Sequence, residues 1–167
     1  MTASIEIVLS SPRWQAALPR LEPMCRRFVA AALAAPSGDG TRTGDVRVAL
    51  ADDAAAHDLN RRFRGIDKPT NVLSFPAHGS DTDRASDPSG LGDILVAFET
   101  TAREAKSQSV ALADHLAHLL VHGVLHLRGH DHERAAEAEI MEALETDILV
   151  RFGVADPYGG SIAERRS

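Results

Sequence analysis

Three histidines, His122, His126 and His132, have the spacing of a metal site. The first two stand four residues apart, so on a helix their side chains share one face about a turn apart. Gly129 can adopt the backbone conformation that ends such a helix and turns the chain back. A third imidazole three residues later can close a site of three nitrogens, which leaves the fourth position of a tetrahedral metal open to water or substrate. The pattern therefore predicts a catalytic metal centre.

The density of histidines around this run argues against coincidence, although a lone His-x-x-x-His pair arises easily by chance. Six of the eight histidines lie between residues 115 and 132, where even scattering predicts roughly one. The segment is apolar nearly all round, which predicts a buried helix from about Ala111, and burial favours the neutral, metal-binding imidazole. A cluster of core histidines satisfied by hydrogen bonds is the alternative. A core histidine cluster would not explain why a glycine turn and a third histidine follow the pair.

Strands and helices must hold this site, and they alternate along the chain. The pattern predicts one α+β domain over residues 1–167, with a single mixed four-stranded sheet, five to six helices and the metal site on a buried helix. The order of the strands does not follow from it. Residues 77–90 are rich in Gly, Ser, Asp and Pro and predict a loop, and residues 159–167 predict a tail. The predicted strands are 4–9, 45–50, 71–75 and 91–97, and the predicted helices are 24–34, 52–63, 100–108, 111 onward and 133–152.

Two helix faces carry expectations of their own. Ile140, Leu144, Ile148 and Phe152 are predicted to form the apolar side of the last helix. The acidic face from Glu133 to Asp147 is expected to be solvated, or else to dock a basic protein.

His115 and His118 lie one to two turns before His122, on a similar face of the predicted helix. They could line a cleft or donate hydrogen bonds behind the metal ligands. We expect instead that they are ordinary polar residues where the helix leaves the core.

Composition limits the classes of protein that fit. The chain has 167 residues, 44% hydrophobic and 25% charged, as in an ordinary globular domain. Its net charge of −6 argues against a protein that coats nucleic acid non-specifically. No basic region precedes an apolar stretch at the amino terminus, so we expect no signal peptide and no membrane. Cys25 is the single cysteine, which predicts a core residue and a reducing cytoplasm.

The histidine run has the spacing of the metalloprotease motif His-Glu-x-x-His-x-x-Gly-x-x-His, except that position 123 is glycine. In those proteases the glutamate is the general base that activates water against an amide. A metal without that base can still act as a Lewis acid and lower the pKa of its bound water to about 7. A metal without a neighbouring general base suits phosphodiester cleavage, because that reaction depends on positioning the substrate and on neutralising the charge of the phosphoryl oxygens.

A phosphate-directed site also needs a cation, and the segment Asn60–Thr70 supplies four against one acid. Gly65 and Pro69 stiffen the turn after Arg64, which could hold its guanidinium for bidentate contact with a phosphate. The alternative is a solvated helix end whose arginines complement the helix dipole.

The chain resembles the YbeY family of bacterial endoribonucleases, the rRNA maturation factors, over roughly residues 45–158. The resemblance implies a zinc-dependent hydrolase of single-stranded RNA, acting in small-subunit rRNA 3′-end maturation and ribosome quality control. It implies His122, His126 and His132 as the zinc ligands and Arg64 as the contact to the scissile phosphate. Its partners would be rRNA, the small ribosomal subunit and assembly factors, with no DNA. The resemblance rests on Leu59–Pro76, Leu91–Ile94 and His122–His132, extended by Met141–Glu145 and Asp156–Tyr158.

Two other functions stay open at this point. The chain could be a peptidase or amidase that uses the same metal with a base such as Glu133 from outside the helix. It could also be a non-catalytic ribosome-assembly adaptor in which zinc is structural. A fourth protein ligand, for example His130, would support the adaptor, because structural zinc keeps no open coordination position.

Overall fold

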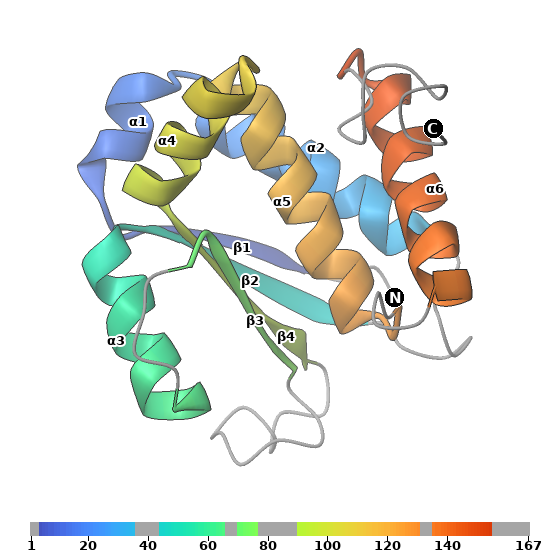
Figure 1. Ribbon diagram of the computed structural model, residues 1–167, viewed down its shortest axis with the longest axis horizontal. Helices are drawn as coiled ribbons and strands as arrows, with labels where there is room; N and C mark the ends of the chain where they lie inside the picture. Colours follow the sequence, from blue (N-terminus) through green and yellow to red (C-terminus); the bar gives the residue numbers. More distant parts are fainter. Residues whose placement is uncertain (1–3, 36–43, 66–69, 77–89, 131–134, 155–167) are drawn as a thin grey trace.

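The four predicted strands form one mixed sheet in the structure, a computed structural model (Figure 1). Strands β1, β2 and β4 are parallel, and β3 pairs with β4 in the antiparallel direction at the edge, so the sheet order is β1-β2-β4-β3. The structure describes residues 4–35, 44–65, 70–76, 90–130 and 135–154. The strands are β1 (Ile5–Leu9), β2 (Asp45–Ala51), β3 (Val72–Pro76) and β4 (Gly90–Ala97).

Six helices surround this sheet within the described residues, which confirms the predicted α+β class. Helices α2 and α5 cover one face of the sheet with α6 packed outside them, and α3 covers the other face (Figure 1). The helices are α1 (Pro12–Ala17), α2 (Leu21–Ala34), α3 (Asp53–Arg64), α4 (Phe98–Gln108), α5 (Leu112–Leu127) and α6 (Ala135–Arg151).

One helix was not predicted, and other helix starts differ from the sequence prediction; α4, for example, begins at Phe98 rather than at Thr100. Helix α1 is not among the predicted helices, although Ser11 caps it by accepting a hydrogen bond from the backbone N–H of Arg13. Helix α2 begins at Leu21 rather than at Met24. Pro23 lies in its first turn, where the missing N–H has no intrahelical partner to lose, so proline does not delay the start. The predicted loop also ends one residue earlier, because Gly90 belongs to β4; its remainder lies outside the described residues.

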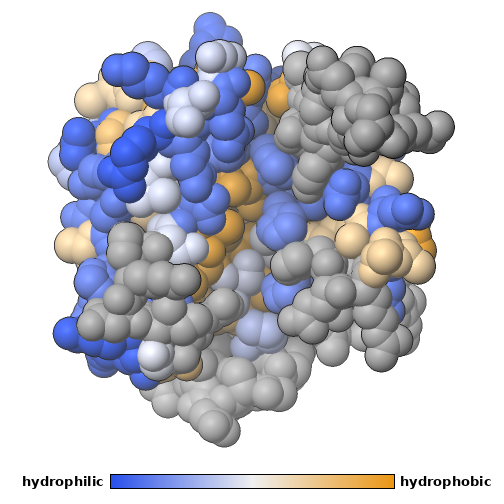
Figure 2. Space-filling model, viewed as in Figure 1, coloured by the Kyte–Doolittle hydropathy of each residue, from blue (hydrophilic) through white to orange (hydrophobic). Residues whose placement is uncertain are grey.

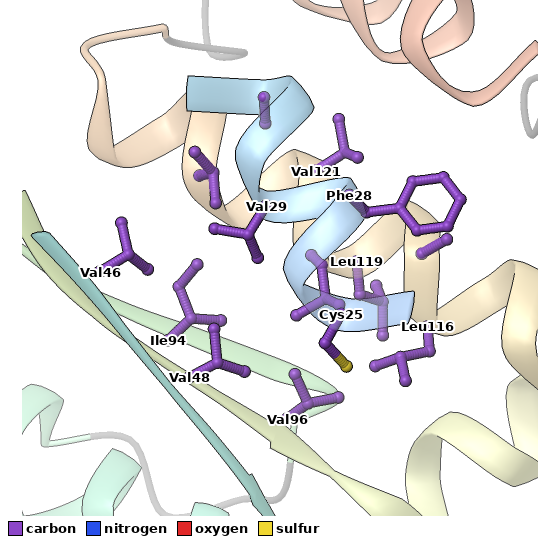
Figure 3. Packing of buried hydrophobic residues seen from close by; sticks show 14 of the residues in the cluster. Cys25, Phe28, Val29, Val46, Val48, Ile94, Val96, Leu116, Leu119 and Val121 are labelled. Atoms are coloured by element: carbon purple, nitrogen blue, oxygen red, sulfur yellow. The ribbon is translucent and has the colours of Figure 1, made fainter. Parts of the chain in front are cut away.

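Helix α5 is the central helix of the core, as its apolar sequence predicts. Ten of its residues are buried. Figure 3 shows Leu116 and Leu119 of α5 beside α2, whose Val29 and Cys25 point toward the sheet. No single helix in the described residues is long and apolar enough to span a bilayer, and α4 with α5 passes that test only as a pair bent by 115°.

Cys25 is a core residue, as predicted. Its side chain is fully buried within the main apolar cluster. Burial, together with the neighbouring Glu22 carboxylate, raises the pKa of the Cys25 thiol to about 12. The thiol is therefore the form that packs, and the thiolate that would bind a metal is disfavoured.

Gly92 sets how closely β4 approaches both β3 and α5 near the carboxyl end of α5. A Cβ at this position would lie 2.6 Å from the carbonyl oxygen of Phe75 and 2.7 Å from Cδ2 of Leu127. The first neighbour is backbone in a paired strand, so it cannot move away without breaking the sheet.

We expect Gly92→Ala to lower the free energy of unfolding by about 1–3 kcal/mol, because the methyl group overpacks the sheet. Urea denaturation measures this change. Gly123→Ala is the comparison variant and should cost less, since the three atoms nearest to a Cβ there are side-chain atoms at 3.1–3.4 Å that can shift slightly, and alanine favours the helix. Equal stability of the Gly92→Ala and wild-type proteins would contradict the steric argument.

Candidate metal centre

The histidines of α5 follow one another along a single side of the helix. The ring centroids of His115 and His118 lie 6.2 Å apart, and those of His118 and His122 lie 6.3 Å apart. His126 follows one turn later, in the last turn of α5. Figure 2 shows a hollow beside α5, with hydrophobic residues in its floor and hydrophilic residues along its side. His118, His122 and His126 are partly exposed, whereas His115 is buried, so the accessible part of this histidine row begins at His118.

Glu145 of α6 joins two of these histidines. Its Oε1 lies 2.9 Å from Nδ1 of His122, and its Oε2 lies 2.8 Å from Nε2 of His118. The side chain of Glu145 is fully buried, whereas those of His118 and His122 are 18% and 29% exposed. The three residues bring their ligand atoms within 4.8 Å of one another, so this group could hold a metal ion.

The contact with Glu145 assigns the two nitrogens of His122 different roles. A carboxylate accepts hydrogen bonds, so Nδ1 of His122 donates to it, and Nε2 is then the nitrogen with a lone pair for a metal. Histidines that bind metals commonly donate their other ring nitrogen to a carboxylate in this way. The donor set of α5 therefore fits a metal ion bound on the side of His122 that faces away from Glu145.

Two of the three predicted ligands lie on α5 as expected, four residues apart. The predicted glycine turn is confirmed: α5 ends at Leu127, Gly129 has a φ of +98°, and the backbone N–H of His130 donates to the carbonyl oxygen of Leu125. His132 lies outside the described residues, as do Asp131 and Glu133, so the third ligand stays a prediction. His130 is buried, at 8% exposure.

His115 and His118 are not ordinary polar residues at a helix exit, so that expectation is wrong. His115 is 5% exposed, and its Nε2 lies 2.8 Å from Oε1 of Glu104, which also accepts a hydrogen bond from Nδ2 of Asn71 at 2.9 Å. His118 shares Glu145 with His122. Helix α5 stays within the core along this stretch, and buried imidazoles there require polar partners.

Glu145 is the residue of this candidate site that the sequence interpretation missed. It belongs to the acidic face that was expected to be solvated, and yet it is fully buried. The predicted apolar side of α6 is confirmed for Ile148, which is 1% exposed, and for Leu144, which packs against the core. It is wrong for Ile140, which is 57% exposed, and for Phe152, which is 37% exposed. The buried face runs instead through Met141, Glu145 and Ile148. That i, i+4, i+7 spacing was the available signal that Glu145 faces inward.

Gly123 explains why the protease glutamate is absent. A Cβ at this position would lie 3.1 Å from Cδ1 of Ile94 and 3.3 Å from Oγ of Ser74, so this side of α5 packs directly on the sheet. A glutamate side chain at position 123 would be directed into β3 and β4, where there is no room for it. The helix therefore has no place for a general base next to His122.

The basic end of α3 is exposed where it is described. Arg61 and Arg62 both pair with Asp58, at 3.0 and 3.3 Å, and their side chains are about three-fifths exposed. These two arginines match the alternative of a solvated helix end. Arg64 is the last residue of α3, and Gly65 ends the helix in the left-handed conformation with a φ of +67°. The side chain of Arg64 lies outside the described part, so its phosphate contact stays a prediction.

Comparison with known proteins gives one consistent family. The family model described as Endoribonuclease YbeY matches residues 14–153. A protein of Paramagnetospirillum magneticum named Endoribonuclease YbeY is 48% identical over 95% of this chain and 99% of its own length. A protein of the same name from Rhodopseudomonas palustris is 48% identical over 92% of this chain and 90% of its own. The solution structure of TM1509 from Thermotoga maritima shares the fold, with a TM-score of 0.52 and 24% identity over 93% of this chain and 99% of that one.

Proposed function

The chain belongs to the YbeY family, and on that premise we propose that it is a zinc-dependent endoribonuclease that cleaves single-stranded RNA. We further propose that its substrate is rRNA, at the 3′ end of the small-subunit RNA, and that it also serves ribosome quality control. Its partners would then be the small ribosomal subunit and assembly factors. A cytoplasmic setting agrees with the single buried cysteine.

His122, His126 and His132 would hold the zinc ion. A zinc ion bound there would supply a Lewis acid for a phosphoryl oxygen and would activate a water molecule. Three imidazole ligands are the donor set of a catalytic rather than a closed structural site. The described residues support this assignment through the carboxylate on Nδ1 of His122.

Arg64 would bind the scissile phosphate. A guanidinium offers two parallel N–H donors to two phosphoryl oxygens and remains charged at every physiological pH. Its contribution would be largest when negative charge accumulates on those oxygens during cleavage. The left-handed Gly65 that follows it fixes where α3 ends and so where this side chain starts.

The packing of Gly123 on the sheet is the observation that favours a nuclease over a peptidase. Amide hydrolysis at a single zinc uses a general base next to the ligands, and position 123 has no room for one. Phosphodiester cleavage depends more on positioning and charge neutralisation, which the histidines and an arginine can provide.

Purified protein incubated with single-stranded RNA and, separately, with an unstructured protein tests this function. We expect cleavage of the RNA that stops with a chelator and returns with added zinc, while duplex RNA and the unstructured protein stay intact. Gel electrophoresis of both substrates measures it. Chelator-sensitive cleavage of the protein with intact RNA would instead establish the peptidase, and metal-loaded protein that cleaves neither but binds ribosomal particles would establish the adaptor.

A further inference from the structure

We propose that Glu145 is a positioning residue for the metal ligand His122 and that His118 holds Glu145 in place. This inference rests on the proposed metal-dependent function and extends it to residues beyond the three ligands. In this arrangement α6 contributes no ligand. It supplies the carboxylate that fixes how an imidazole of α5 meets the metal.

The geometry restricts Glu145 to this role. Each carboxylate oxygen is within hydrogen-bond distance of a different imidazole, one turn apart on α5. The residue is fully buried, and Met141 and Ile148, one turn to either side on α6, are each 1% exposed. A side chain anchored at both oxygens and packed on both sides cannot swing away, so the ring of His122 is held in one orientation.

The chemistry of the contact acts on the metal through His122. Donation from Nδ1 to a carboxylate leaves Nε2 as the ligating nitrogen and increases its basicity, which strengthens the bond to a metal. The same contact satisfies a buried carboxylate, which would otherwise be very unfavourable in the core. His118 donates to the second oxygen, so each oxygen of the buried carboxylate accepts a hydrogen bond from an imidazole.

The alternative is that His118, His122 and Glu145 themselves bind the metal. Such an ion would have to replace both hydrogen bonds of Glu145, and it would depend on a carboxylate with no exposed surface. The side chain of Glu145 is closed off from solvent, whereas a catalytic zinc needs a position that substrate can reach. A Glu145 that contacts His122, and not the metal itself, therefore agrees better with the proposed nuclease.

Metal affinity measured by competition with a chromophoric zinc chelator tests the role of Glu145. We expect Glu145→Gln to bind zinc roughly 10- to 100-fold more weakly than the wild type, the usual effect of losing a partner behind a ligand. Glu139→Gln, an exposed glutamate on the same helix, is the matched control and should bind as the wild type does. Cobalt-substituted protein should show a shifted visible absorption band in Glu145→Gln alone, which a purely structural role of Glu145 would not produce.

His118→Ala provides a second variant in case Glu145→Gln does not fold. It removes the hydrogen bond that His118 makes to Glu145, so we expect a smaller loss of zinc affinity with a full metal stoichiometry. Unchanged affinity in folded Glu145→Gln would overturn the proposal, and so would a complete loss of metal in His118→Ala. If the wild type binds zinc but does not cleave RNA, the proposed nuclease fails while the affinity comparison still decides the role of Glu145. A wild type that binds no zinc would overturn both.

Discussion

Replacement of His126 with alanine should remove the bound metal and, with it, cleavage of RNA. His126 lies one helical turn after His122 on α5, and the proposed site has three protein ligands. Loss of one of three ligands removes a direct bond to the metal, so the affinity should fall by more than the roughly 10- to 100-fold expected for an outer partner. Elemental analysis of the purified variant, together with an assay on single-stranded RNA, measures both effects.

His57→Ala is the matched control for this variant. His57 belongs to α3, which covers the opposite face of the sheet, so its loss should change neither metal content nor cleavage. Far-ultraviolet circular dichroism establishes that both variants fold. A folded His126→Ala protein that keeps its full metal content would exclude His126 as a ligand. The group formed by His118, His122 and Glu145 would then be the candidate metal site.

Replacement of Arg64 with alanine should reduce cleavage of single-stranded RNA by about 10²- to 10³-fold, the usual effect of removing one donor to a developing oxyanion. The metal content and the urea midpoint should stay at the wild-type values, because Arg64 is not one of the proposed metal ligands and is the last residue of its helix. Arg64→Lys should restore only part of the activity, since lysine keeps the charge but lacks the planar pair of donors.

Arg61→Ala separates a specific phosphate contact from general attraction to RNA. Arg61 lies on the same helix, is 61% exposed and pairs with Asp58, so its loss should lower cleavage only slightly. Initial rates at saturating and limiting RNA concentrations distinguish weaker binding from slower cleavage. Wild-type rates in a folded, metal-loaded Arg64→Ala protein would remove Arg64 from the proposed mechanism.

The sequence determined the features that depend on neighbours along the chain. Strand alternation, the helix predicted over residues 52–63 and the apolar continuity of α5 all predicted elements that the structure confirms. The turn at Gly129 after α5 is also a local property, since it needs only a residue that tolerates positive φ. These signals fixed two candidate ligands on one helix.

The tertiary structure alone decided which distant residues meet at that helix. Glu145 is 23 residues from His122 in sequence, and only the packing of α6 on α5 brings their side chains to 2.9 Å. The same packing turned a glutamate of an acidic-looking helix inward and left Ile140 outside. Gly123 likewise has an explanation only once α5 lies on β3 and β4. Local sequence specifies which backbone conformation a segment adopts, but the partner of a buried polar group is chosen by the helices and strands that pack around it.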